Sequence, residues 1–128
     1  MKFGFYDSCI LISICLSGRK GACLKDIITY IDYADHSVIT WQELKSGLHK
    51  LKRIGAIIEK KKSIYPTPKF ISSWNKKIKN MKGHSVMDFI GEVNEYLDQT
   101  YAAFKIQPEN VPTEIKKEDY HFAIKENR

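Results

Sequence analysis

The stretch from residue 40 to residue 65 constrains the fold most, because it joins a well-marked helix start to two short β-prone runs. Thr40-Trp41-Gln42-Glu43 matches the capping box, in which a Thr oxygen caps the backbone and a Glu three residues later reaches back. The predicted helix carries an inward stripe of Leu44, Leu48 and Leu51, and it ends at Gly55. Gly47 lies inside this helix, where glycine is unfavourable, and we explain it by close packing against the preceding helix.

The two β-prone runs follow the helix and flank a basic tip. They are Ala56-Ile57-Ile58-Glu59 and Ser63-Ile64-Tyr65, and the tip is Lys60-Lys61-Lys62. Short β-prone runs around a polar tip predict a β-hairpin. The tip lacks the Asn-Gly or Asp-Gly pair that is typical of the tightest hairpin turns. Pro66 and Pro68 end the second strand.

Two helices are predicted before this stretch. Residues 8–17 are apolar almost all round, which predicts a buried central helix, with Asp7 as its N-cap. A second helix over residues 24–34 carries one apolar stripe, and residues 35–37 form a turn. The stripe consists of Leu24, Ile27, Ile28 and Ile31.

Three further helices are predicted after the hairpin. One covers residues 69–82, and a long amphipathic helix covers residues 86–104. A short helix over residues 115–124 lies in a polar C-terminal stretch. The apolar stripe of the long helix consists of Val86, Phe89, Ile90, Val93, Leu97, Tyr101 and Phe104. Something must cover this stripe, either a second copy of the chain or the chain's own core, and we expect the second copy.

Charge is distributed unevenly along the 128 residues, which are about enough for one domain. The net charge is +6, and residues 45–82 hold 12 basic residues against one acid, Glu59. Residues 83–128 hold 5 basic and 9 acidic residues. This asymmetry predicts one basic face, of the kind that meets a polyanion, and a separate, slightly acidic region.

Neither the N-terminus nor the cysteines indicate export. The apolar run over residues 9–16 is far shorter than the about 20 residues that span a bilayer, and Asp7, Arg19 and Lys20 do not fit a signal peptide. We therefore expect a cytoplasmic protein with no membrane partner. Cys9 and Cys15 are expected to be inert core residues. Cys23 precedes a helix, so it is either a reactive thiolate that senses oxidants or an ordinary loop residue, and we favour the second.

The order helix, helix, helix, basic hairpin over residues 5–68 resembles the winged helix-turn-helix domain of bacterial transcription regulators. The resemblance is carried by Leu24-Lys25-Asp26-Ile27-Ile28, by residues 39–51, and by Lys52-Arg53-Ile54-Gly55-Ala56-Ile57 with the hairpin to Thr67. The connection over residues 35–39 is longer than in the simplest motifs, and Cys23 stands where Ser or Thr is usual. The resemblance implies a mainly α fold with a small β-hairpin wing. It also implies a domain over residues 1–68. Residues 69–128 lie outside the resemblance, and we expect them to form a helical extension whose last 20 or so residues are loosely ordered.

The resemblance implies a DNA-binding regulator that is not an enzyme. The recognition helix, about residues 40–54, would enter the major groove, and the wing, about residues 56–65, would lie on the backbone or in the minor groove. The base-reading candidates are Gln42, Lys45, Ser46 and His49. The phosphate-contacting candidates are Lys50, Arg53, Lys60, Lys61 and Lys62. The alternative without a DNA-binding role is that the first set lies on an ordinary solvated helix face and that the lysines of the tip lie in an ordinary solvated turn.

The expected partners are double-stranded DNA and a second copy of the chain, bound through the helix over residues 86–104. The alternative is a protein–protein interaction module that uses the same stripe and does not read DNA. Binding of single-stranded RNA is less favoured, because the chain lacks an aromatic platform. No phosphate loop, zinc spacing or nucleophile motif is present, so we expect no catalysis, no cofactor and no metal.

Overall fold

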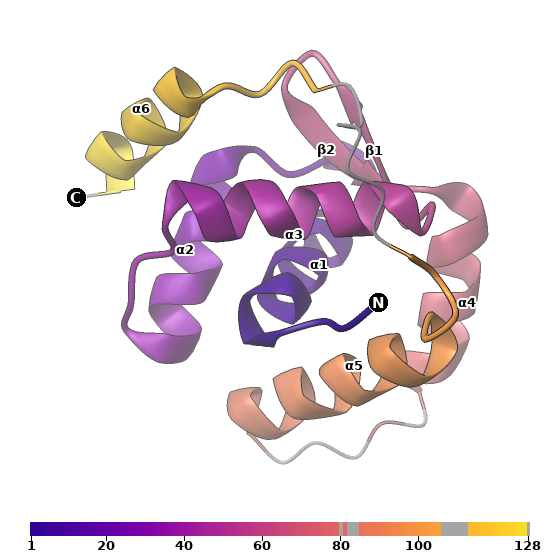
Figure 1. Ribbon diagram of the computed structural model, residues 1–128. Helices are drawn as coiled ribbons and strands as arrows, with labels where there is room; N and C mark the ends of the chain where they lie inside the picture. Colours follow the sequence, from indigo (N-terminus) through magenta and orange to yellow (C-terminus); the bar gives the residue numbers. More distant parts are fainter. Residues whose placement is uncertain (80, 82–84, 106–112, 128) are drawn as a thin grey trace.

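The computed structural model describes residues 1–79, 81, 85–105 and 113–127. The described part of the chain is mainly helical, with one small antiparallel hairpin, which confirms the expected fold class (Figure 1). The elements are α1 (Phe5–Ser17), a 3-10 turn η1 (Gly18–Lys20), α2 (Leu24–Asp35), α3 (Trp41–Arg53), β1 (Ile57–Lys60), β2 (Ser63–Pro66), α4 (Pro68–Ile78), α5 (Val86–Thr100) and α6 (Lys117–Asn127).

Helix α1 lies at the centre of the core and contacts α2, α3 and α5. Its side chains from Asp7 to Ile14 are buried, as the all-round apolar sequence predicts. The helix begins at Phe5, three residues before the predicted start, so the prediction that Asp7 is the N-cap is wrong. Asp7 lies inside the first turn, and its carboxylate accepts a hydrogen bond from the Gly4 amide at 2.8 Å.

Gly47 lets α3 approach α1 closely. A Cβ atom at this position would collide with the Ile10 side chain and with the Asp7 carboxylate. The explanation by close packing is therefore correct, but the partner is α1 and not α2, which the sequence analysis named. Alanine at position 47 would push the two helices apart, because packed interiors have no spare volume.

The hairpin is a two-residue turn with both central residues at positive φ. Lys60 pairs with Ser63, and Lys61 and Lys62 have φ values of 49° and 66°. This is the backbone of a type I′ turn, which normally takes Asn and Gly. The hairpin is joined to the core because Ile64 exchanges two backbone hydrogen bonds of 2.8 Å with Ala22.

Helix α4 begins at Pro68, one residue before the predicted start. Thr67 caps it by accepting a hydrogen bond from the Phe70 amide at 3.3 Å, and proline suits the first helical position. Phe70 and Trp74 are buried and stack on each other. The helix ends at Ile78, and the predicted end at residue 82 lies outside the described residues.

Helix α5 packs its apolar stripe against α1 of the same chain. Ile90, Val93 and Leu97 are at most 1% exposed. The expected dimer interface on this stripe is therefore wrong, because the chain's own core covers it, which was the other alternative. The helix ends at Thr100, before the predicted residue 104. There the amino group of Met1 donates hydrogen bonds to the carbonyls of Ala102 and Phe104.

The short helix predicted over residues 115–124 corresponds to α6, which spans Lys117–Asn127. It packs along α2. Ile115, Tyr120 and Ala123 are buried in the same hydrophobic cluster as α1. The predicted division at residue 68 is thus not a division of the core. Among the described residues, none of the helices combines the length and apolar character needed to cross a membrane.

Candidate nucleic-acid interface

The four predicted base-reading residues lie together on the outer face of α3. Gln42, Lys45 and Ser46 are exposed, and His49 is half-buried. The capping box fixes the start of this helix: the Glu43 amide donates to the Thr40 hydroxyl at 3.2 Å, and the Glu43 carboxylate accepts from the Thr40 amide at 2.9 Å. All four residues line one cavity of about 560 Å³.

The other wall of this cavity is formed by the C-terminal arm, which we define as residues 113–127. Thr113, Ile115 and Lys116 face α3 across the cavity, and from Thr113 the arm runs alongside the hairpin towards α6 (Figure 1). We call the space the α3–arm cavity. Sequence analysis placed no functional residue in this segment.

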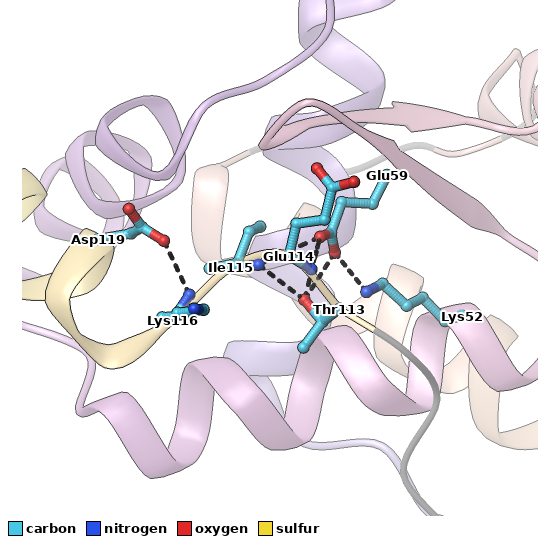
Figure 2. A network of polar contacts seen from close by, with 7 residues as sticks. All are labelled: Lys52, Glu59, Thr113, Glu114, Ile115, Lys116 and Asp119. Atoms are coloured by element: carbon cyan, nitrogen blue, oxygen red, sulfur yellow. Dashed lines mark hydrogen bonds and ion pairs between the residues drawn. The ribbon is translucent and has the colours of Figure 1, made fainter.

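Glu59 on β1 anchors the beginning of the arm (Figure 2). Its carboxylate accepts hydrogen bonds from the Thr113 hydroxyl at 2.8 Å and from the amides of Glu114 and Ile115. It also pairs with the ammonium group of Lys52 on α3. Burial raises the pKa of Glu59, but the hydrogen bonds from Lys52, Glu114 and Thr113 outweigh burial and hold the pKa below the usual 4.5.

Asp119 and Tyr120 anchor the second part of the arm. The Asp119 carboxylate accepts the Lys116 amide at 2.8 Å and pairs with Lys62 of the hairpin tip at 3.0 Å, and both contacts lower its pKa. The Tyr120 hydroxyl donates to the Ile39 carbonyl at 2.6 Å. Its ring lies 5.9 Å from the ring of Trp41.

The lysines of the hairpin tip are exposed. Lys60 and Lys61 project into solvent, whereas Lys62 pairs with Asp119 although 56% of its side chain is accessible. The arm therefore contacts both the outer face of α3 and the tip of the hairpin. It follows that these two basic surfaces lie on the same side of the molecule.

The other two predicted phosphate contacts, Lys50 and Arg53, lie apart from this group. Lys50 pairs with Asp7 at 2.9 Å and is only 17% exposed. The guanidinium of Arg53 lies over the Phe104 ring at 5.7 Å. The structure therefore brings five of the nine predicted residues, the four on α3 and Lys62, to the side of the arm, and it turns Lys50 towards α1 and Arg53 towards Phe104.

The acidic anchors of the arm were missed in the sequence. A signal for Glu59 was present, because it is the single acid within a stretch of 12 basic residues. Such a residue has many possible partners and a high probability of being held in an ion pair. Nothing in the pattern of residues 113–127 marks Thr113 as a partner of Glu59 or Asp119 as a partner of Lys62, since these contacts depend on the tertiary fold.

The cysteines and histidines do not add a second site within the described residues. Burial raises the pKa of Cys9 and of Cys15 to about 12, in line with the prediction of inert core thiols. Cys23 is exposed, and its thiol donates to the Asp26 carboxylate at 3.3 Å. No group of three His, Cys, Asp or Glu residues in the described part of the chain could hold a metal ion.

Comparisons with protein-family models, with curated proteins and with solved structures find no match to this chain. The arrangement of α3, the hairpin and the arm is therefore the basis on which a function can be argued.

Proposed function

We propose that the protein binds double-stranded DNA, with α3 in the major groove and the hairpin on the backbone or in the minor groove, as in winged helix-turn-helix regulators. The observation that carries this proposal is the common orientation of two basic surfaces. The arm lines a cavity against the outer face of α3, and its Asp119 pairs with Lys62 of the hairpin tip. A duplex that approached from this side would meet both surfaces.

The outer face of α3 has suitable chemistry for reading base edges. The Gln42 amide can pair with adenine through one donor and one acceptor, and Lys45 can donate to guanine or to a phosphate. Ser46 is small enough to allow close approach. All three side chains are exposed on the surface of the helix.

The hairpin tip supports the proposal through its backbone. Lys61 and Lys62 adopt positive φ values that favour asparagine and glycine. Lysine at such positions costs conformational energy, and residues that keep such strain are concentrated at functional sites. Phosphate binding would account for lysine at these positions, because each cation that neutralises a phosphate releases a counterion.

The arm would have to move when DNA binds. Residues 113–116 form a wall beside the same α3 residues that would enter the groove, which is about 12 Å wide. Asp119 already neutralises Lys62, so a phosphate would have to replace this carboxylate. The proposal thus includes competition between the arm and DNA for one surface.

Pairing of two copies stays a prediction, as does a cytoplasmic location. A dimer would place two recognition helices on two half-sites, but its interface cannot be the buried stripe of α5. The alternative function, a protein–protein interaction module, was expected to use the same apolar stripe of α5, and that stripe is buried in the chain's own core. DNA binding by α3 and the hairpin is therefore the better supported function.

Fluorescence anisotropy with a random duplex over a salt series tests the proposal. We expect affinity to fall steeply with salt, and the Lys60/Lys61/Lys62→Ala variant to have a slope shallower by up to about 2–3 units. The matched control is Lys2/Lys105/Lys125→Ala, which removes the same charge from exposed positions outside α3 and the hairpin. No binding at low salt, or equal slopes for the two variants, would contradict the proposal.

A further inference from the structure

The α3–arm cavity has the size of a small-molecule site. Its volume of about 560 Å³ lies within the usual range of ligand pockets, roughly 300–1,000 Å³. It is formed by two segments that are far apart in the sequence, α3 and the beginning of the arm. A molecule inside it would contact both segments at once.

One part of the cavity wall is apolar and held rigidly. Leu48 and Ile115 line this part from α3 and from the arm, and at 5% and 3% exposure they are held in place but present only a small apolar surface. Trp41 adds a flat aromatic surface, and its ring is supported by the Tyr120 ring at 5.9 Å. A flat apolar body would fit this wall, because burial against fixed apolar groups is favourable in proportion to area.

The rest of the wall is basic and polar. Lys45, Lys52 and Lys116 line the cavity, and among the residues that the structure describes no Asp or Glu lines it. Lys52 is neutralised by Glu59. Among the residues that the structure describes, Lys45 is in no ion pair, and the charge of Lys116 interacts with the Asp119 carboxylate, which already pairs with Lys62. Two lysines thus share one carboxylate, and this side of the cavity keeps a net positive charge.

We propose that the α3–arm cavity binds a small organic anion that has a flat apolar body and one carboxylate. The apolar body would lie against Trp41, Leu48 and Ile115. The carboxylate would accept charge-assisted hydrogen bonds from Lys45 on one side and Lys116 on the other. Because these two lysines come from α3 and from the arm, the carboxylate would link the two segments.

Binding of this anion would stabilise the docked arm. The site exists only while Ile115 and Lys116 lie opposite α3, so the ligand gains contacts in the docked state alone and shifts the arm towards it. A consequence, which rests on the proposed DNA function, is that the anion would weaken DNA binding by the same free energy with which DNA weakens anion binding.

NMR of the two indole N–H groups tests the site without DNA. Trp41 lines the cavity, whereas Trp74 is 3% exposed and stacks on Phe70, so Trp74 is an internal control. The probe is naphthoate, and its neutral analogue naphthamide has the same shape without the charge. The variants are Lys45/Lys116→Met and, as a control of equal charge change, Lys2/Lys105→Met.

We expect naphthoate to give a saturable shift of the Trp41 signal and no shift of the Trp74 signal. Naphthamide and the Lys45/Lys116→Met variant should each bind at least about tenfold more weakly, as loss of charge-assisted hydrogen bonds requires. The Lys2/Lys105→Met variant should bind as the wild type does.

Three results would overturn the anion site. They are no saturable Trp41 shift up to about 5 mM naphthoate, equal affinity for the two probes, and equal weakening in the two double variants. None of these results depends on DNA, so failure of the anion site and failure of the DNA proposal are separate outcomes.

Discussion

Helix α5 and the C-terminal arm both cover helices of the central core, but carboxylates contribute more to holding the arm. Helix α5 buries Ile90, Val93 and Leu97 against α1 to 1% exposure or less. The arm buries Ile115 at 3% and Tyr120 at 9% exposure, and it depends in addition on the carboxylates of Glu59 and Asp119. Apolar burial does not depend on protonation, whereas contacts of carboxylates do. From this comparison we expect the arm to be released more readily than α5.

Truncation of a buried α5 side chain should have the largest effect. Leu97→Ala should lower the free energy of unfolding by about 2–5 kcal/mol, because it removes apolar contacts and leaves a cavity next to α1. Urea denaturation measures this change. Met87→Ala in the same helix is the control, since Met87 is 49% exposed and its loss should cost less than about 0.5 kcal/mol. Similar costs for the two variants would contradict the assignment of α5 to the core.

Removal of the Glu59 carboxylate should release the arm and leave α5 in place. Glu59→Ala takes the acceptor from three donors of the arm and removes the carboxylate that pairs with Lys52. We expect a loss of about 3 kcal/mol, because several hydrogen bonds to one charged, largely buried acceptor are lost together. Glu59→Gln keeps an acceptor and should cost less. Amide NMR should show changes in α6 and none in α5, and equal changes in both helices would contradict a separable arm.

Acid should release the arm before it unfolds the core. The pKa values of Glu59 and Asp119 are lowered in the folded protein, so these carboxylates stabilise it above their ordinary values of 4.5 and 3.8. That stabilisation is lost as the pH falls through the lowered folded-state pKa values. We expect the Trp41 indole signal to change at a higher pH than the signals of α5. In the Asp119→Asn variant the difference in pH between the Trp41 change and the α5 changes should become smaller. An unchanged difference would contradict the role of Asp119.

The Tyr120 hydroxyl tests a single neutral contact of the arm. Tyr120→Phe removes the hydrogen bond to the Ile39 carbonyl and should cost about 1 kcal/mol of arm docking. If the arm competes with DNA, the same variant should bind duplex DNA more tightly than the wild type in the anisotropy assay. Tyr33→Phe, at an exposed position of α2, is the matched control and should change neither quantity. Weaker DNA binding by Tyr120→Phe would contradict the competition.

A glycine substitution in the hairpin turn should have the smallest effect on stability, and it should stabilise the protein where the other variants destabilise it. Lys61→Gly places the residue that tolerates positive φ at a position where φ is 49°, which should stabilise the protein by about 0.5–1 kcal/mol. Thermal unfolding measures the gain. Lys60→Gly is the control, because Lys60 lies in β1, where glycine is unfavourable. A Lys61→Gly variant that is less stable than the wild type would contradict the strained turn.

Local patterns in the sequence predicted the elements of the fold better than their contacts. The capping box at Thr40 and Glu43 fixed the start of α3 to the residue, because both partners lie within one turn. Three contacts could not be predicted in this way: Gly47 on α1, Glu59 with the arm, and Tyr120 with Ile39. Their partners are 37 or more residues away along the chain, and nothing local specifies such distances.

The same limit explains the outcome for α5. Its apolar stripe was visible in the sequence, but a stripe does not say whether it is covered by the same chain or by a second copy. The Asp7 cap was misassigned because an acid that caps from the third helical position looks the same in sequence as one at the N-cap. Of the candidate site, the exposed lysines were predictable, whereas the arm opposite them was not.

Amide hydrogen exchange of α5 and α6 in one sample, with and without duplex DNA, tests the account most directly. Without DNA, α6 amides should exchange through a local opening of lower free energy than the opening that exposes α5. Added DNA should speed exchange in α6 and leave α5 unchanged, because DNA would occupy the surface that the arm covers. Exchange of α6 only through the global unfolding that exposes α5, or increased protection of α6 in the presence of DNA, would contradict a releasable arm that competes with DNA.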